Sequence, residues 1–227
     1  MAHTLWSHGM CRFRKKYCMN RRWFSSLLVA TSSVLAFGAM VQSTAHAAVE
    51  APDALIKRVS IDVLDAIKAD KSIQGGDTSK VVALVDSKIM PNVNFQRMTA
   101  SATGRAWRTA TPEQQKQLQE EFKTLMVRTY SGALSEVKDQ TIVLKPLRAA
   151  ADDTEVIVRS EVRGRGDPIQ LDYRLEKSAT GWKIYDLNVL GVWLVETYRA
   201  QFAQEINANG IEGLIAKLSD RNKRAKR

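Results

Sequence analysis

The sequence predicts an α+β fold in which helices pack on one face of a twisted four-stranded antiparallel sheet. Apolar residues recur about every 3.6 positions in the first half of the chain and every second position from Lys138 onward. The links between the second-half segments are short and rich in turn residues, which favours antiparallel neighbours. Both cysteines of the 227-residue chain lie before residue 48, so a hydrophobic core must hold the rest together without disulfides.

The first half is expected to form helices over about 52–70, from Asp77 or Thr78 to Pro91, over 95–102 and over 112–134. Asp77 or Thr78 is placed to cap the second of these helices, and Thr111 followed by Pro112 is a favourable start for the long one. One face of the long helix is apolar and carries Leu118, Phe122, Leu125, Met126, Thr129, Tyr130 and Ala133.

The second half is expected to form strands over 140–149, 154–164, 168–178 and 181–189. In the third strand, apolar and polar residues alternate from Ile169, which indicates one buried face and one wet face. In the last strand, Trp182 and Ile184 fall on one face and Tyr185, Leu187 and Val189 on the other, so we expect cover on both faces. After Gly191 the pattern returns to helix, and a short terminal helix begins near Ile211.

The formal charge of +10 is unevenly distributed along the chain. Residues 1–47 hold six basic and no acidic side chains, residues 48–218 hold 23 of each sign, and residues 219–227 hold five basic and one acidic. The body is therefore neutral, which excludes nucleic-acid binding as the main function. We expect one domain over 48–218 and a basic, disordered tail over 219–227.

Residues 1–47 have the organisation of a secretory signal peptide. Basic residues precede the uncharged stretch 24–41, and Ala45-His46-Ala47 supplies a small-x-small cleavage site. The true start could be Met19, which would leave a signal of ordinary length, and Arg21-Arg22 leaves a twin-arginine export route open. A transmembrane anchor is the alternative, but the stretch is diluted by serine and threonine. We therefore expect the chain to be exported and released.

No cysteine or histidine follows residue 47, so an imidazole base, a thiolate nucleophile or a Cys/His metal site cannot be built in the mature chain. Asp186 is the most interesting carboxylate because its neighbours are apolar, and a buried acid could act in catalysis. Pairing with an arginine or a backbone N–H is the favoured interpretation. Glu120-Glu121 is expected on an exposed helix face, and Gly164-Arg165-Gly166-Asp167 is expected to be a hairpin turn.

Several runs occur together in a fixed order: Val85-Asp-Ser-Lys-Ile-Met-Pro-Asn-Val-Asn-Phe95, Gly104-Arg-Ala-Trp107, Ala110-Thr-Pro-Glu-Gln114, Leu125-Met-Val-Arg-Thr-Tyr130, Trp182-Lys-Ile-Tyr-Asp-Leu-Asn-Val-Leu-Gly-Val192 and Tyr198-Arg-Ala-Gln-Phe202. Together they resemble the toluene-tolerance, or MlaC, family of periplasmic phospholipid-binding proteins. The likeness covers most of residues 50–218, while residues 1–18 and 219–227 lie outside it.

The resemblance implies a soluble carrier without catalytic group, cofactor or metal. Such a carrier shuttles phospholipid between an outer-membrane lipoprotein–porin complex and an inner-membrane ABC transporter with an MCE-domain component, and so maintains outer-membrane lipid asymmetry. It also implies only transient membrane contact and an apolar lipid cavity between the sheet and the helices.

Face patterning leads to a hypothesis for the site. We expect acyl chains to lie between the sheet residues Val156, Val158, Ile169, Leu171 and Tyr173 and the helical residues Leu125, Met126 and Tyr130. The head group would lie at the mouth near Arg105 or Arg108. Two other classes stay open: an adaptor with the same patterning but a dry core, and a carboxylate-dependent hydrolase.

Overall fold

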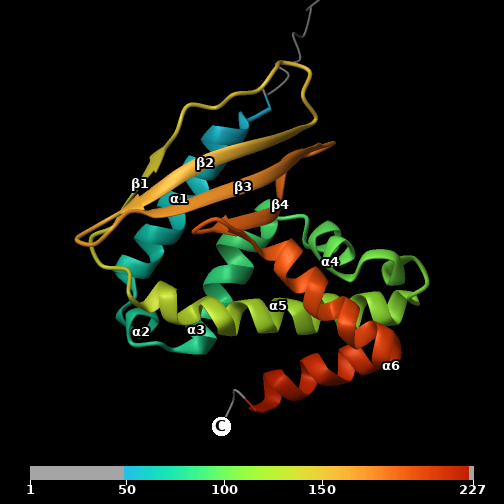
Figure 1. Cartoon of the computed structure of the whole chain (residues 1–227). Helices are drawn as coiled ribbons and strands as arrows, with labels where there is room; N and C mark the ends of the chain where they lie inside the picture. Colours follow the sequence, from blue (N-terminus) through green and yellow to red (C-terminus); the bar gives the residue numbers. More distant parts are fainter. Residues whose placement is uncertain (1–48, 225–227) are drawn as a thin grey trace, which may run out of the picture. The chain divides into compact units, whose positions relative to one another are not determined.

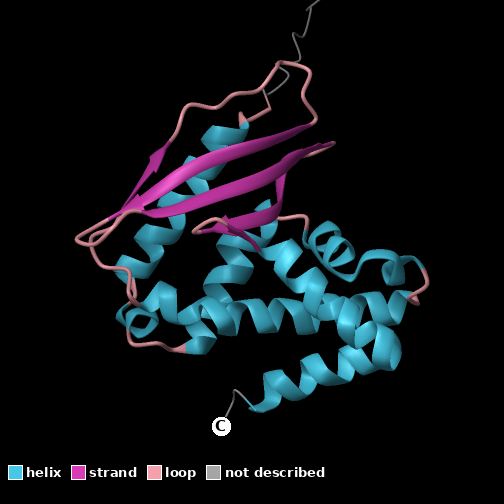
Figure 2. Cartoon of the chain, in the orientation of Figure 1, coloured by secondary structure: helices cyan, strands magenta, loops and turns pink. Residues whose placement is uncertain are grey.

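The computed structural model describes residues 49–224 and confirms the α+β class (Figure 1; Figure 2). The predicted signal peptide over 1–47 lies outside the described residues. The helices are α1 (Pro52–Ala69), α2 (Lys71–Gln74), α3 (Thr78–Leu84), α4 (Phe95–Thr103), α5 (Pro112–Ser135) and α6 (Leu194–Arg224). The strands are β1 (Thr141–Leu144), β2 (Glu155–Arg163), β3 (Ile169–Ser178), β4 (Gly181–Val189) and β5 (Val192–Trp193).

Helix starts follow the predicted capping residues. The Asp77 carboxylate accepts the backbone N–H of Ser79 at the start of α3, and Thr111 forms a reciprocal capping box with Gln114 at the start of α5. The helix predicted to continue to Pro91 changes pitch after Leu84, through a π-helical turn at Val85–Ile89 and a 3-10 turn at Met90–Asn92. Proline cannot donate the backbone hydrogen bond that a regular helix would require there.

The strands form an antiparallel meander in chain order, with five strands instead of the expected four because the two-residue β5 pairs with the end of β4. The first strand is shorter than predicted, ending at Leu144 shortly before Pro146, which has no N–H to donate. Across the sheet, Val158 lies opposite Tyr173, and Tyr173 lies opposite Leu187.

A β-bulge in β4 changes which residues share a face. Leu175 pairs with Ile184, but Arg174 pairs with Asp186, so Tyr185 is the extra residue. The predicted division of β4 is therefore wrong, because Ile184 and Leu187 lie on the same face of the sheet. We call this the apolar face. It carries Val156, Val158, Ser160, Val162, Ile169, Leu171, Tyr173, Leu175, Ile184, Leu187 and Val189.

Three separate hydrophobic cores lie among the helices and beneath the apolar face. The sheet core joins Leu55, Ile56 and Val59 of α1 to Val156, Val158, Leu175 and Ile184. The helical core joins α4, α5 and α6 around Phe122, whose ring centroid is 4.9 Å from that of Tyr198 and 5.2 Å from that of Phe202. The third core gathers Ile67, Ile73, Val81, Leu84, Val85 and Val127. Among the helices, α5 packs mainly on α3, α4 and α6, whereas α1 packs on β1 and β2.

Helix α6 bends at Gly210, whose φ of 71° is accessible to glycine at little cost, and its second half turns back along α5 (Figure 1). Leu214 and Leu218 thereby enter the helical core. The prediction of a disordered tail is wrong for residues 219–224, which continue the helix. Asn222 is buried and donates to the Glu121 backbone carbonyl, at 2.9 Å, and to its carboxylate.

Candidate binding site between the sheet and the helices

Residues of the apolar face differ in how completely they are covered. Where α1 lies over β2, Val156 and Val158 are buried in the sheet core. Across the neighbouring strands β3 and β4, Leu171, Tyr173, Leu187 and Val189 are only half-buried. The same sheet face therefore passes from dry packing to side chains that keep accessible surface.

Tyr173 is the most informative of these residues. Its ring packs against the sheet core, and burial raises the pKa of its phenol above the usual range, against the opposing effect of the Ser160 and Ser60 hydroxyls. Even so, its side chain keeps solvent-accessible surface. A group that is deep but still accessible is expected on the wall of an internal hollow and not in a closed core.

Other half-buried apolar side chains lie at the margins of the three cores. Leu187, directly opposite Tyr173, packs against the helical core, as do Met126 and Tyr130 of α5. Ile89 and Met90, from the irregular turns after α3, are half-buried against the third core. Large apolar side chains therefore lie at the margins of the cores. Side chains of this kind are typical of the lining of an apolar ligand site.

The structure distributes the predicted lipid-binding residues among different environments. All five sheet residues lie on the apolar face as predicted, but Val156 and Val158 are sealed in the sheet core and Ile169 is 44% exposed at the start of β3. Leu125 is sealed in the helical core. The half-buried members are Met126, Tyr130, Leu171 and Tyr173. Face patterning assigned Leu187 to the other face of β4, whereas the bulge brings it opposite Tyr173 on the apolar face.

Arg105 and Arg108 lie elsewhere. They belong to the 3-10 turn Gly104–Arg108 after α4 and line a surface hollow of about 670 Å³ between this segment and α6. The helical core, against which Trp107 packs, lies on the inner side of this segment. Neither Tyr173 nor Leu171 is among the residues that line this hollow.

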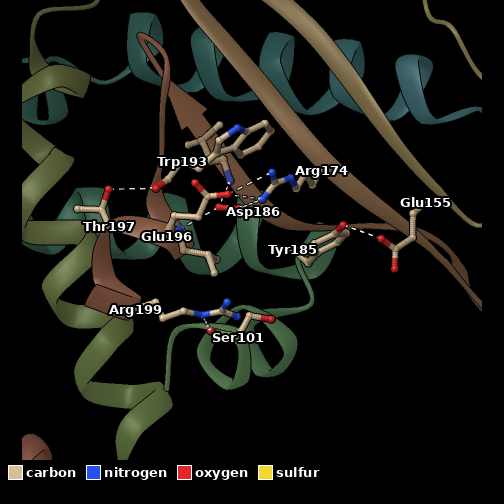
Figure 3. A network of polar contacts seen from close by, with 11 residues as sticks. Ser101, Glu155, Arg174, Tyr185, Asp186, Trp193, Glu196, Thr197 and Arg199 are labelled. Carbon is tan, nitrogen blue, oxygen red and sulfur yellow. Dashed lines mark hydrogen bonds and ion pairs between the residues drawn. The ribbon is translucent and has the colours of Figure 1, made fainter. Parts of the chain in front are cut away.

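The opposite face of the sheet carries a satisfied polar network (Figure 3). Asp186 Oδ2 accepts from Arg174 Nη1 at 2.9 Å, and Asp186 Oδ1 accepts the backbone N–H groups of Leu187, at 2.8 Å, and Val195, at 3.1 Å. The Arg174 guanidinium stacks on Trp193, 3.8 Å from the ring centroid, and also contacts Glu196. Burial raises the pKa of Asp186, while these donors favour its charged form. The favoured interpretation of Asp186 as a paired carboxylate is confirmed.

A second part of this face joins α4 to the sheet. Arg97 pairs with Glu176 and, at 2.6 Å, with Glu155, and its guanidinium lies 3.6 Å from the centroid of the Tyr185 ring. The Tyr185 hydroxyl donates to Glu155 at 2.8 Å. Burial and this carboxylate raise the pKa of Tyr185 to about 12. The bulge that displaces Tyr185 thus serves to anchor α4.

Comparison with known proteins bears on the apolar site. The family model for the MlaC protein matches residues 57–220. The chain belongs to the MlaC family. An MlaC-family relative, the toluene tolerance protein Ttg2D of Pseudomonas putida, is 27% identical over 165 residues, covering 72% of this chain and 76% of that protein. The intermembrane phospholipid transport system binding protein MlaC of Haemophilus influenzae is 22% identical over 202 residues, covering 87% and 92%.

A solved structure adds a bound ligand to the comparison. The phospholipid-binding protein of Ralstonia solanacearum, determined in complex with a phospholipid, is 51% identical, with a TM-score of 0.75 over 77% of this chain and 98% of that one. The resemblance to the MlaC family found in the sequence is thus confirmed. Within residues 49–224, no helix is both long and apolar enough to cross a bilayer.

Proposed function

We propose that this protein is a periplasmic phospholipid carrier that holds acyl chains against the half-buried part of the apolar face. Family membership and the phospholipid-bound relative support a phospholipid-binding transport protein. The observation that carries the assignment to this region is Tyr173, which packs against the sheet core and still keeps accessible surface. Met126, Tyr130, Leu171 and Leu187 would line the same site.

The energetics suit a carrier. Burying roughly 30 acyl methylenes at about 0.8 kcal/mol each would give over 20 kcal/mol relative to water, beyond the practical limit of noncovalent affinity. A membrane buries the same chains equally well, so the net free energy of transfer between membrane and protein is small. Loading and release can then be reversible without any chemical step.

The proposed donors and acceptors are an outer-membrane lipoprotein–porin complex and an inner-membrane ABC transporter with an MCE-domain component. The names of the relatives, which refer to intermembrane phospholipid transport and to toluene tolerance, support this role. Export of the chain is supported by the signal-like features of residues 1–47. Exchange with these complexes would maintain the lipid asymmetry of the outer membrane.

The test is native mass spectrometry, with lipid extraction, of protein purified without detergent. We expect a stoichiometric phospholipid. Leu171→Trp should lower its occupancy by filling the site, while Gln170→Trp, one residue away on the other face of β3, should not. Lipid-free wild-type protein would contradict the proposal and favour an adaptor with a dry core.

A hydrolase would require a free acid or base on the described surface. Asp186 has no free oxygen, because each accepts at least one hydrogen bond. Asp186→Asn should therefore leave any lipid-hydrolysing activity of the preparation unchanged. A loss of such activity, with the fold retained, would instead favour an enzyme.

A further inference from the structure

The hollow between α4 and α6 has a composition that the proposed function does not explain. We call it the arginine groove. It is lined by Arg97, Arg105, Arg108 and Arg199, together with small and apolar residues of α4, of α6 and of the turn Gly104–Arg108. Four arginines and no acidic side chain border it. Its volume of about 670 Å³ is within the range of ligand pockets, roughly 300–1,000 Å³.

Two of the four arginines are already engaged and fix the walls. Arg97 ties α4 to the sheet through Glu155 and Glu176. Arg199 of α6 donates from Nε to the Ser101 carbonyl of α4 at 2.8 Å, so it spans the two helices (Figure 3). The width of the groove is therefore set before any partner arrives, which lowers the entropic cost of binding.

The other two arginines are available. Arg105 and Arg108 are exposed, and within residues 49–224 neither takes part in an ion pair. Gly104 places them, since its φ of 64° and ψ of −132° form a conformation that side chains disfavour and that turns the chain out of α4. Two unpaired guanidinium groups at the edge of a preformed hollow indicate a site for carboxylates or other anions.

The shape of the groove selects the kind of anion. Ala100, Ala106 and Ala203 are small, so the main chain of a partner can approach closely, and Trp107 and Ile206 add apolar surface. The lining also includes Thr103, which is buried, so the hollow extends below the surface that a flat bilayer would contact. Neither Tyr173 nor Leu171 is among the residues that line it.

We propose that the arginine groove is the docking site for an acidic segment of a protein partner, one that alternates carboxylates with small apolar residues. This inference rests on the proposed function, because a carrier must dock before it exchanges its lipid. The apolar face would hold the cargo, and the arginine groove would recognise the protein that delivers or receives it.

The test uses the full-length protein and a fluorescein-labelled peptide of alternating glutamate and alanine, with its glutamine counterpart as a reference. Anisotropy should show binding of the glutamate peptide that weakens with salt. The double variant Arg105→Glu/Arg108→Glu should bind at least about tenfold more weakly, since two ion pairs are replaced by repulsion. Arg148→Glu/Lys177→Glu, with the same charge change at exposed sites outside the groove, should stay within about twofold.

A steric variant separates docking from diffuse attraction. Ala203→Trp would fill the groove without changing charge and should also weaken peptide binding, whereas Ala216→Trp, at an exposed position further along α6, should not. Equal weakening by both charge-reversed pairs, or no effect of Ala203→Trp, would overturn the proposal.

Two further readouts distinguish other ligands and the proposed function itself. If Arg105→Glu/Arg108→Glu lost co-purified phospholipid, the arginines would belong to a head-group site and the proposal would fail. If it lost binding to phosphatidylglycerol–phosphatidylcholine vesicles but kept the peptide, the groove would be a membrane site. Lipid-free wild-type protein would defeat the carrier function alone, while failure to bind peptide with lipid present would defeat only the docking site.

Discussion

The two faces of the sheet belong to the same strands, but they differ in how completely their side chains find partners. On the polar face, Asp186, Arg174 and Glu155 each have partners within hydrogen-bonding distance. On the apolar face, packing is complete at Val158 and incomplete at Tyr173, which lie directly opposite each other in adjacent strands.

The comparison shows where function can lie. A satisfied ion-pair network holds helices in place and offers no free group to a substrate. A large apolar surface that is left without partners deep in a protein costs stability, since the lining atoms lose dispersion contacts. Evolution retains such a surface where a ligand fills it, so the incompletely packed apolar face is the candidate site and the ion-pair network of the polar face is its scaffold.

The largest effect on stability is expected when the buried carboxylate of the polar face is removed. Asp186→Ala would remove the buried partner of Arg174 and the acceptor from the first turn of α6, and we expect a loss of about 3–5 kcal/mol in the free energy of unfolding. Glu196→Ala removes a second, exposed partner of Arg174 and should cost less than about 1 kcal/mol. Urea denaturation measures both, and equal losses would show that the buried network is not the anchor.

The residues of the apolar face should fall into two groups, one that contributes mainly to stability and one that contributes mainly to lipid binding. Val158→Ala opens a gap in the sheet core and should cost about 2 kcal/mol with little change in bound lipid. Leu171→Ala should cost less stability but lower lipid occupancy more, because its side chain is only half-buried. Denaturation of delipidated protein and mass spectrometry of the native form provide the two values. The reverse ranking would contradict the division.

A smaller effect on stability is expected near the end of α6. Polar contacts there are satisfied, so they should again contribute to stability and not to lipid binding. Asn222→Ala removes the hydrogen bonds to Glu121 and should cost about 1–2 kcal/mol, while Lys223→Ala at the exposed neighbouring position should have almost no effect. A thermal melt of each variant tests this. An unchanged melting temperature for Asn222→Ala would show that residues 219–224 are dispensable.

The smallest effect concerns pH. The hydrogen bonds from Arg97 and Tyr185 lower the pKa of Glu155 below its ordinary value of 4.5. The folded protein therefore binds fewer protons here than the unfolded chain, and the contribution is fully present above pH 4.5 and lost as the pH falls through the lowered pKa. Because the Glu155 side chain is 52% exposed, Glu155→Gln should cost less than about 1 kcal/mol at neutral pH.

The control for this prediction is Glu120→Gln on the exposed face of α5. The difference between Glu155→Gln and the wild type should disappear in strongly acidic buffer, whereas Glu120→Gln should match the wild type throughout. A difference for Glu155→Gln that persists at low pH would indicate lost packing instead of lost charge.

Much of this arrangement could be predicted from periodicity and capping. Alternation in β3 placed Leu171 and Tyr173 on one buried face, and the Thr111-Pro112 pair identified the start of α5. The bulge at Tyr185 could not be predicted, because one extra residue in a strand looks like ordinary alternation with the faces exchanged. Its consequence is that Leu187 joins the candidate site.

The sequence also could not predict which residues along one face of the sheet are fully buried. Val158 and Tyr173 alternate with polar neighbours in the same way, and only the packing of the folded chain buries one and leaves the other half-buried. The continued helix after Leu218 did have a signal, since Leu214, Leu218 and Asn222 repeat every four residues. The basic composition of the segment obscured it, because charged residues at a chain end are typical of a tail.

The central claim is that the half-buried part of the apolar face holds acyl chains. The most direct measurement loads the protein with a phospholipid that carries a photoactivatable diazirine in one acyl chain and identifies the labelled residues by peptide mass spectrometry. The account predicts labels on Tyr173, Leu187, Met126 or Tyr130. Labels confined to the polar face or to the arginine groove would contradict it.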